Sequence, residues 1–155
     1  MTFGTRRATV TTVAALALLV GASAVTMPLA DAKTKSAHAT MAVAAVSYSP
    51  AQATAGAKAY GANCASCHGE KLEGGVGPAL SGATLNTLAK NTKLTVGDMF
   101  TFLSQQMPLN APASLSKTQY AAIMAYVLKF NGYAASTKAL TYAGATGSNV
   151  VMRSK

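Results

Sequence analysis

Two cysteines and one histidine within five residues are the part of this sequence best suited to chemistry. The string Cys64-Ala65-Ser66-Cys67-His68 has the spacing C-x-x-C-H. On a helical turn, positions i, i+3 and i+4 share one face, so both thiols and the imidazole would point the same way. Cys64 and Cys67 can then form thioether bonds to the vinyl groups of a haem, and His68 can bind its iron as an axial ligand. The spacing therefore predicts covalent haem attachment.

Three other uses of the two cysteines fit the sequence less well. A thioredoxin-like redox pair needs a βαβ setting, and no strand-rich pattern surrounds the motif. A structural zinc site needs about four Cys or His ligands. The chain holds two cysteines and two histidines, and His38 falls in a predicted linker. A disulfide between Cys64 and Cys67 would leave the adjacent His68 unexplained.

The first 32 residues have the pattern of a secretory signal peptide. Two arginines precede an uncharged, apolar run over residues 8–25, and cleavage sites of the A-x-A type end at Ala32 and at Ala39. The run is also nearly long enough to span a bilayer, so an uncleaved anchor within residues 8–30 is the alternative. We therefore expect a periplasmic location, with membrane attachment only if this segment is uncleaved.

The remainder of the chain divides into three parts. Residues 33–48 are rich in Ala, Ser, Thr and Lys without a clear period, which predicts a flexible linker. Residues 49–135 carry the helical patterns and form one small domain, near the lower size limit for a self-sufficient apolar core. A haem would supply the missing apolar centre. Residues 136–155 form a tail that could either pack back or extend into solvent.

The chain is strongly basic, with 13 Lys and Arg residues against four Asp and Glu residues. Removal of residues 1–32 takes away two arginines and one aspartate, leaving eleven basic residues against three acidic ones. The sequence contains no basic stripe interleaved with aromatic residues, so it does not indicate a nucleic-acid partner. The charge either keeps the surface soluble or steers the domain onto an acidic partner. The candidate steering residues are Lys58, Lys71, Lys90, Lys93 and Lys117.

The folded part is predicted to be all-α, with three to five helices. Ser49 and Pro50 suit the N-cap and first position of a helix that continues to about residue 62. The last helix begins at a capping box over residues 116–119 and ends at Asn131-Gly132. Gly56 is costly inside a helix, so we expect the last helix to pack closely against it.

Met107 is the strongest candidate for a second iron ligand. Short helices are predicted near residues 84–90 and after the capping box that begins at Thr95, and Pro108 ends the second of them. Met107 thus lies at a helix exit, where the backbone can turn its side chain toward a flat cofactor. A thioether ligand raises the reduction potential relative to a second imidazole. The competing methionines lie in apolar helix stripes, the linker or the C-terminus: Met99, Met124, Met41 and Met152.

A glycine-rich loop around residues 73–80 completes the predicted site. Gly75-Val76-Gly77 lacks the third glycine and the preceding strand of a dinucleotide site. We expect the loop to pass near the proximal side of the haem. There the carbonyl oxygen of Pro78 could accept the Nδ1 hydrogen of His68, which would fix the ring and raise its basicity.

Together these features resemble class I, mono-haem cytochromes c over about residues 49–133. The matching segments are YGANCASCHG at 60–69, GPAL at 77–80, Met107-Pro108 and AYV at 125–127. The resemblance implies a small cytochrome c-like globule of helices wrapped around one covalent haem c. It also implies crossed first and last helices. The site roles that it implies are thioether attachment at Cys64 and Cys67, iron ligation by His68 and Met107, and a Pro78 carbonyl on the proximal histidine.

A finer similarity concerns the segments MPLNAPASL at 107–115 and NGY at 131–133. They are similar to haem domains that accompany bacterial quinoprotein dehydrogenases. The resemblance as a whole implies a one-electron carrier that is not itself an enzyme, with a quinoprotein dehydrogenase or a terminal oxidase as its redox partner. Two alternatives stay open. One is a haem enzyme or gas sensor with an open sixth iron position, and the other is a permanently bound haem subunit of a dehydrogenase or oxidase.

Overall fold

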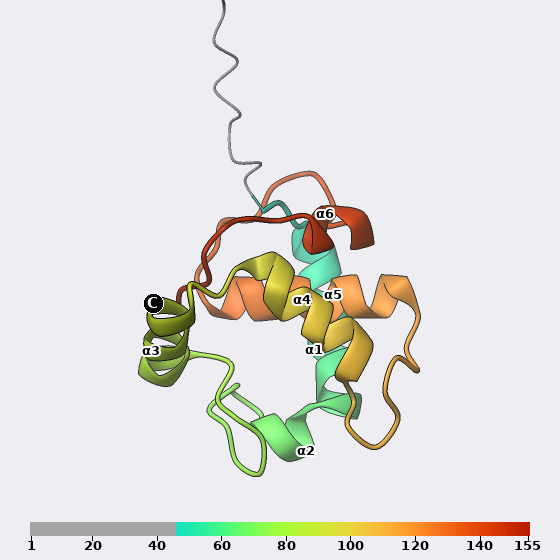
Figure 1. Cartoon of the computed structure of the whole chain (residues 1–155). Helices are drawn as coiled ribbons and strands as arrows, with labels where there is room; N and C mark the ends of the chain where they lie inside the picture. Colours follow the sequence, from blue (N-terminus) through green and yellow to red (C-terminus); the bar gives the residue numbers. More distant parts are fainter. Residues whose placement is uncertain (1–45) are drawn as a thin grey trace, which may run out of the picture. The chain divides into compact units, whose positions relative to one another are not determined.

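The computed structural model describes residues 46–155 (Figure 1). This part of the chain contains six helices and, besides them, a single isolated bridge between Thr95 and Val151. The all-α prediction is confirmed, with one helix more than the three to five expected. The helices are α1 (Pro50–Asn63), α2 (Ala65–His68), α3 (Gly82–Thr92), α4 (Val96–Gln106), α5 (Lys117–Phe130) and α6 (Tyr142–Thr146).

Several predictions fall outside the described residues. They are the signal peptide with its cleavage sites, the anchor over residues 8–30, most of the linker, His38 and Met41. Within residues 46–155, no helix combines the length and the apolar character needed to cross a bilayer.

The predicted crossing of α1 and α5 is present at Gly56. A Cβ atom added at Gly56 would overlap the backbone carbonyl group of Ala122, so no larger residue fits. Beside this crossing, the rings of Tyr60 and Tyr126 pack with their centroids 5.2 Å apart. The close approach of the two backbones offsets the intrinsic cost of a glycine inside a helix.

Side-chain caps fix the starts of three helices, as the sequence predicts. Ser49 accepts a backbone N–H bond in the first turn of α1. Thr95 and Asp98 form a reciprocal capping box on α4, and Ser116 and Gln119 form one on α5. Each box satisfies two N–H groups that a helix start would otherwise leave without partners. The helix α3, predicted near residues 84–90, extends two residues further at each end.

The C-terminal segment packs against the globule, which decides between the two alternatives left open by the sequence. α6 contacts α4 and α5, and the chain then runs back to α3 (Figure 1). Met152 is 2% exposed, and its N–H donates to the carbonyl oxygen of Leu94 at 2.8 Å. The Asn86 side chain exchanges two hydrogen bonds with the backbone of Ser154, at 2.7 and 2.9 Å.

The fold also begins earlier than predicted. Tyr48, which the sequence assigns to the 33–48 linker, is buried, and its hydroxyl donates to the carbonyl oxygen of Tyr133 at 2.5 Å. The N–H of Ser136 donates to the carbonyl oxygen of Tyr48 at 2.8 Å. The last residues of the predicted linker are therefore part of the globule, held by contacts with residues distant in sequence.

Candidate haem site

The C-x-x-C-H motif forms a single helical turn, α2, directly after α1. The N–H groups of Cys67 and His68 both donate to the carbonyl oxygen of Cys64, at 3.1 and 2.9 Å. This turn places all three side chains on the wall of one cavity. The structure thus brings together the two cysteines and the histidine that the spacing singled out.

The imidazole ring of His68 is held by the following loop. The ring is buried, with 9% of the residue exposed, and its Nδ1 lies 2.8 Å from the carbonyl oxygen of Pro78. A carbonyl oxygen only accepts hydrogen bonds, so Nδ1 carries a hydrogen, and in the neutral ring the lone pair is then on Nε2. This is the arrangement in which a neutral histidine can bind a metal through Nε2 while its other nitrogen fixes the ring.

Two glycines fasten this loop to the motif. The N–H of Gly74 donates to the carbonyl oxygen of His68, and the N–H of Gly77 donates to that of Cys67, both at 2.8 Å. Gly74 has a φ of 92°, a conformation that L side chains rarely adopt. A Cβ atom at Gly77 would lie 2.8 Å from Cε1 of His68, so the glycine backbone lies directly against the ring.

The cavity has a volume of about 1110 Å³ and is lined by residues of all the helices from α1 to α5. This volume is slightly above the range of about 300–1,000 Å³ that is usual for ligand and cofactor pockets. Met107 also lines this cavity, half-buried, at the C-cap of α4 where the backbone becomes extended. Most of the wall is apolar, including Leu85, Leu94, Leu103, Ile123 and Val127.

The apolar side chains at the cavity test whether a haem suits it. Six large apolar residues are exposed in the described part of the chain, and four of them line the cavity: Val76, Leu88, Phe102 and Leu109. Contiguous apolar surface of this kind marks a binding site. A haem is large, flat and mostly apolar, and its iron suits imidazole and thioether ligands. The wall and the donor set therefore fit a haem.

Two other methionines also line the cavity, so Met107 is one of three thioether side chains there. Met124 on α5 is fully buried, and Met99 on α4 is half-buried. Met152 is buried under the C-terminal segment and does not line the cavity. Of the three methionines that line the cavity, only Met107 lies beyond the end of a helix, which is the feature on which its prediction as a ligand rests.

The chemistry of the two thiols does not support the other uses of the cysteines. Burial, with a smaller contribution from the neighbouring Cys67, raises the pKa of the Cys64 thiol to about 11. A reactive C-x-x-C redox pair needs a lowered thiol pKa. Residues 46–155 also contain no group of three or more His, Cys, Asp and Glu side chains that could hold a metal ion, as a zinc site would require.

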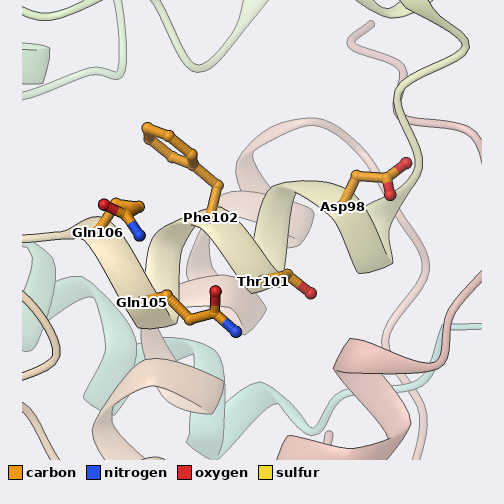
Figure 2. A pocket seen from close by; sticks show the side chains of 5 residues that line it. All are labelled: Asp98, Thr101, Phe102, Gln105 and Gln106. Carbon is orange, nitrogen blue, oxygen red and sulfur yellow. The ribbon is translucent and has the colours of Figure 1, made fainter.

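The lysines proposed for steering do not line the cavity. Among the described residues, Asp98 is the one Asp, Glu, Lys or Arg that lines the cavity. Hydrogen bonds from the side chain and the backbone of Thr95 lower the pKa of its carboxyl group. Asp98 also borders a smaller, open hollow on the outer face of α4, with Thr101, Phe102, Gln105 and Gln106 (Figure 2). Figure 2 shows these side chains projecting from successive turns of one helix.

Sequence reasoning missed two residues near the site. Phe102 is exposed, yet it lines the cavity. Tyr120 is buried in α5, and its hydroxyl donates to the carbonyl oxygen of Met107. No local pattern reveals either feature, because both depend on where the loop after α4 runs.

Comparison with known proteins identifies one family and one similar solved structure. Residues 51–127 match the family described as cytochrome c oxidase, cbb3-type, subunit III. Among solved structures, the chain is similar to the sulfane dehydrogenase SoxCD from Paracoccus pantotrophus, with 27% identity and a TM-score of 0.49. That similarity covers 64% of this chain and 52% of the other, so the chain spans about half the length of the one it matches. No curated protein gives a significant match.

The family match extends from the first turn of α1 through the C-x-x-C-H motif and the cavity into α5. It therefore covers every element that positions the predicted haem side chains. The chain belongs to the c-type cytochromes, and its cofactor is a covalently attached haem c.

Proposed function

We propose that this cytochrome is an exported one-electron carrier in which His68 and Met107 both bind the haem iron. The observation that carries the proposal is the position of Met107 at a helix end on the wall of the cavity that His68 also lines. A haem bound here supplies an iron that alternates between the ferric and ferrous states. With two protein ligands, no position on the iron is left open for a substrate.

The side chains of the cavity serve this role in distinct ways. Cys64 and Cys67 tether the cofactor through thioether bonds, and His68 keeps a fixed tautomer through its bond to Pro78. A thioether from Met107 would favour the reduced iron and raise the potential. The apolar wall keeps water away from the iron, so the surroundings reorganise little when the charge changes. These roles require no bond to be made or broken in a substrate.

The partner is proposed to be another redox protein. The matched family is described as a subunit of a cytochrome c oxidase, which supports an oxidase as the class of partner. The surplus of basic residues favours an acidic docking surface. A carrier steered by exposed charge should dissociate from its partner as salt is raised, because screening weakens such contacts. Copurification at high salt would instead indicate a permanently bound haem subunit.

Export is supported by the signal-like pattern of the first 32 residues. The intact mass of the purified protein tests it, since cleavage after Ala32 or Ala39 and addition of one haem give distinct masses. A mass that retains the whole N-terminus would favour the membrane-anchored alternative over residues 8–30.

The ligand assignment is tested by replacing each methionine of the cavity in turn. Met107→Ala should abolish the sulfur-to-iron charge-transfer band of the ferric protein and allow the ferrous protein to bind carbon monoxide readily. Met99→Ala and Met124→Ala, which replace the other two methionines lining the cavity, are the controls and should keep the band. A band that survives Met107→Ala, or ready carbon monoxide binding by the unsubstituted protein, would contradict the proposal and support an open sixth position.

A further inference from the structure

We infer that Tyr120 is a positioning residue that holds the Met107 loop closed over the cavity. The inference rests on the proposed function, because it takes Met107 as an iron ligand. The loop leaves α4 at Met107 and reaches α5 after Leu115. Tyr120 lies in the first turns of α5, where it is 2% exposed.

The hydroxyl group of Tyr120 joins the two ends of this loop. It donates to the carbonyl oxygen of Met107 at 2.6 Å and accepts from the N–H of Leu115 at 3.3 Å. One side chain on a neighbouring helix therefore fixes both the residue that carries the thioether and the residue where the loop ends. Because both bonds go to backbone atoms, they constrain the path of the loop whatever the intervening side chains are.

The rest of the loop has little else to hold it. Residues 109–114 are all exposed within the polypeptide, and four of them line the cavity: Leu109, Asn110, Ala111 and Ser114. The hydrogen bonds within this stretch are local, from the N–H of Ala111 to Pro108 and from the N–H of Ser114 to Ala111, at 2.9 and 3.3 Å. A segment with exposed backbone and few packed side chains opens easily. The position of Met107 thus depends on its attachment to α4 on one side and on Tyr120 on the other.

Loss of the Tyr120 hydroxyl should make it easier for the loop to open. The carbonyl oxygen of Met107 would lose a buried donor, and an unsatisfied group of this kind favours conformations in which water reaches it. In those conformations the thioether is away from the iron. An external ligand that competes with Met107 would then bind more tightly, because less energy is needed to displace the loop.

Imidazole binding to the ferric holoprotein measures this opening directly. Tyr120→Phe keeps the ring and removes only the hydroxyl. It should bind imidazole about tenfold more tightly than the unsubstituted protein, as judged by loss of the charge-transfer band. The reason is that losing one hydrogen bond changes an equilibrium constant by about tenfold. The reduction potential should fall, because thioether ligation is weakened.

Tyr126→Phe is the matched control. It makes the same chemical change on the same helix, and the Tyr126 hydroxyl has no hydrogen-bond partner in the described structure, so imidazole affinity should stay at the unsubstituted value. Denaturant unfolding of both variants separates loop opening from general destabilisation. If Tyr120→Phe loses stability but binds imidazole no more tightly than Tyr126→Phe, Tyr120 has a structural role only and the inference is overturned.

The outcome is distinguishable from failure of the proposed function. If Met107→Ala keeps the charge-transfer band, the ligand assignment itself is wrong. If Met107→Ala abolishes the band while Tyr120→Phe and the unsubstituted protein bind imidazole equally, the assignment holds and only the role of Tyr120 is rejected.

Discussion

Gly77 lies in direct contact with the imidazole ring of His68. A Cβ atom at position 77 would lie 2.8 Å from Cε1 and 2.9 Å from Nδ1, closer than carbon atoms pack in proteins. The same ring atom Nδ1 is 2.8 Å from the carbonyl oxygen of Pro78, one residue further along the loop. The ring is therefore confined by two consecutive loop residues, one through contact and the other through a hydrogen bond.

The first prediction concerns this contact. Gly77→Ala should push the imidazole or the loop out of place, at a cost of about 1–3 kcal/mol in the free energy of unfolding. The iron ligand would be misplaced as well, so the absorption spectrum and the reduction potential of the holoprotein should change. Gly61→Ala is the control, because a Cβ atom there meets nothing within 4 Å. Equal spectra and potentials for the two variants would show that the loop can yield without moving the ring.

The second prediction concerns the crossing of α1 and α5. Gly56→Ala places a methyl group onto the backbone of Ala122, which cannot rotate away as a side chain could. We expect a loss of about 3 kcal/mol or more, measured by denaturant unfolding of the holoprotein. Gly61→Ala, on the same helix, should instead gain up to about 1 kcal/mol, because alanine favours the helix more than glycine does. Equal effects of both substitutions would refute the close approach.

The third prediction concerns the C-terminal segment. Met152→Ala should lower the free energy of unfolding by about 2–5 kcal/mol, since it empties a buried position. Val151, its neighbour, is 53% exposed, and Val151→Ala should change the free energy by less than about 0.5 kcal/mol. If the two variants unfold alike, the segment does not pack as described and adds little to the stability of the globule.

The fourth prediction is a dependence of stability on pH through Asp98. Hydrogen bonds from Thr95 hold the pKa of this carboxyl group below its ordinary value of 3.8. The unfolded chain therefore takes up the proton first as the pH falls. The contribution of the capping box is present above the unfolded pKa and is lost as the pH falls through the folded one.

Asp98→Asn removes the titrating group and is the means of isolating this effect. The difference in unfolding free energy between the unsubstituted protein and this variant should be constant near neutral pH and should shrink as the pH falls below about 4. A difference that stays constant down to strongly acidic pH would show that Asp98 does not titrate between the folded and unfolded states.

Local signals carried most of what the sequence could predict. The caps at Ser49, Thr95 and Ser116 lie within four residues of the groups they satisfy, so they can be predicted from the sequence without knowing the fold. The crossing at Gly56 was predictable because a glycine inside a helix needs a reason. The approach of the Pro78 carbonyl to His68 was predictable from the chemistry of a histidine ligand, which needs an acceptor at its second nitrogen.

Contacts between residues distant in sequence account for what was missed. Tyr48 lies in a stretch of small residues without period, and its burial depends on Tyr133 and Ser136. Met152 and Ser154 are anchored by α3 and by the backbone before α4, and nothing in the composition of the segment reveals this. From the sequence, Tyr120 is one more aromatic residue among the apolar residues of α5. The role of its hydroxyl becomes visible only when the path of the Met107 loop is known.

The buried position of Cys64 bears on how this cytochrome matures. In the folded chain Cys64 is buried, and its raised thiol pKa leaves few nucleophilic thiolates at neutral pH. The five-residue motif, by contrast, needs only its own helical turn to present both sulfurs. Thioether formation is therefore easiest on the unfolded polypeptide, before α5 packs against α1. Assembly of the holoprotein then becomes an ordered process in which the cofactor is joined first and the helices close around it.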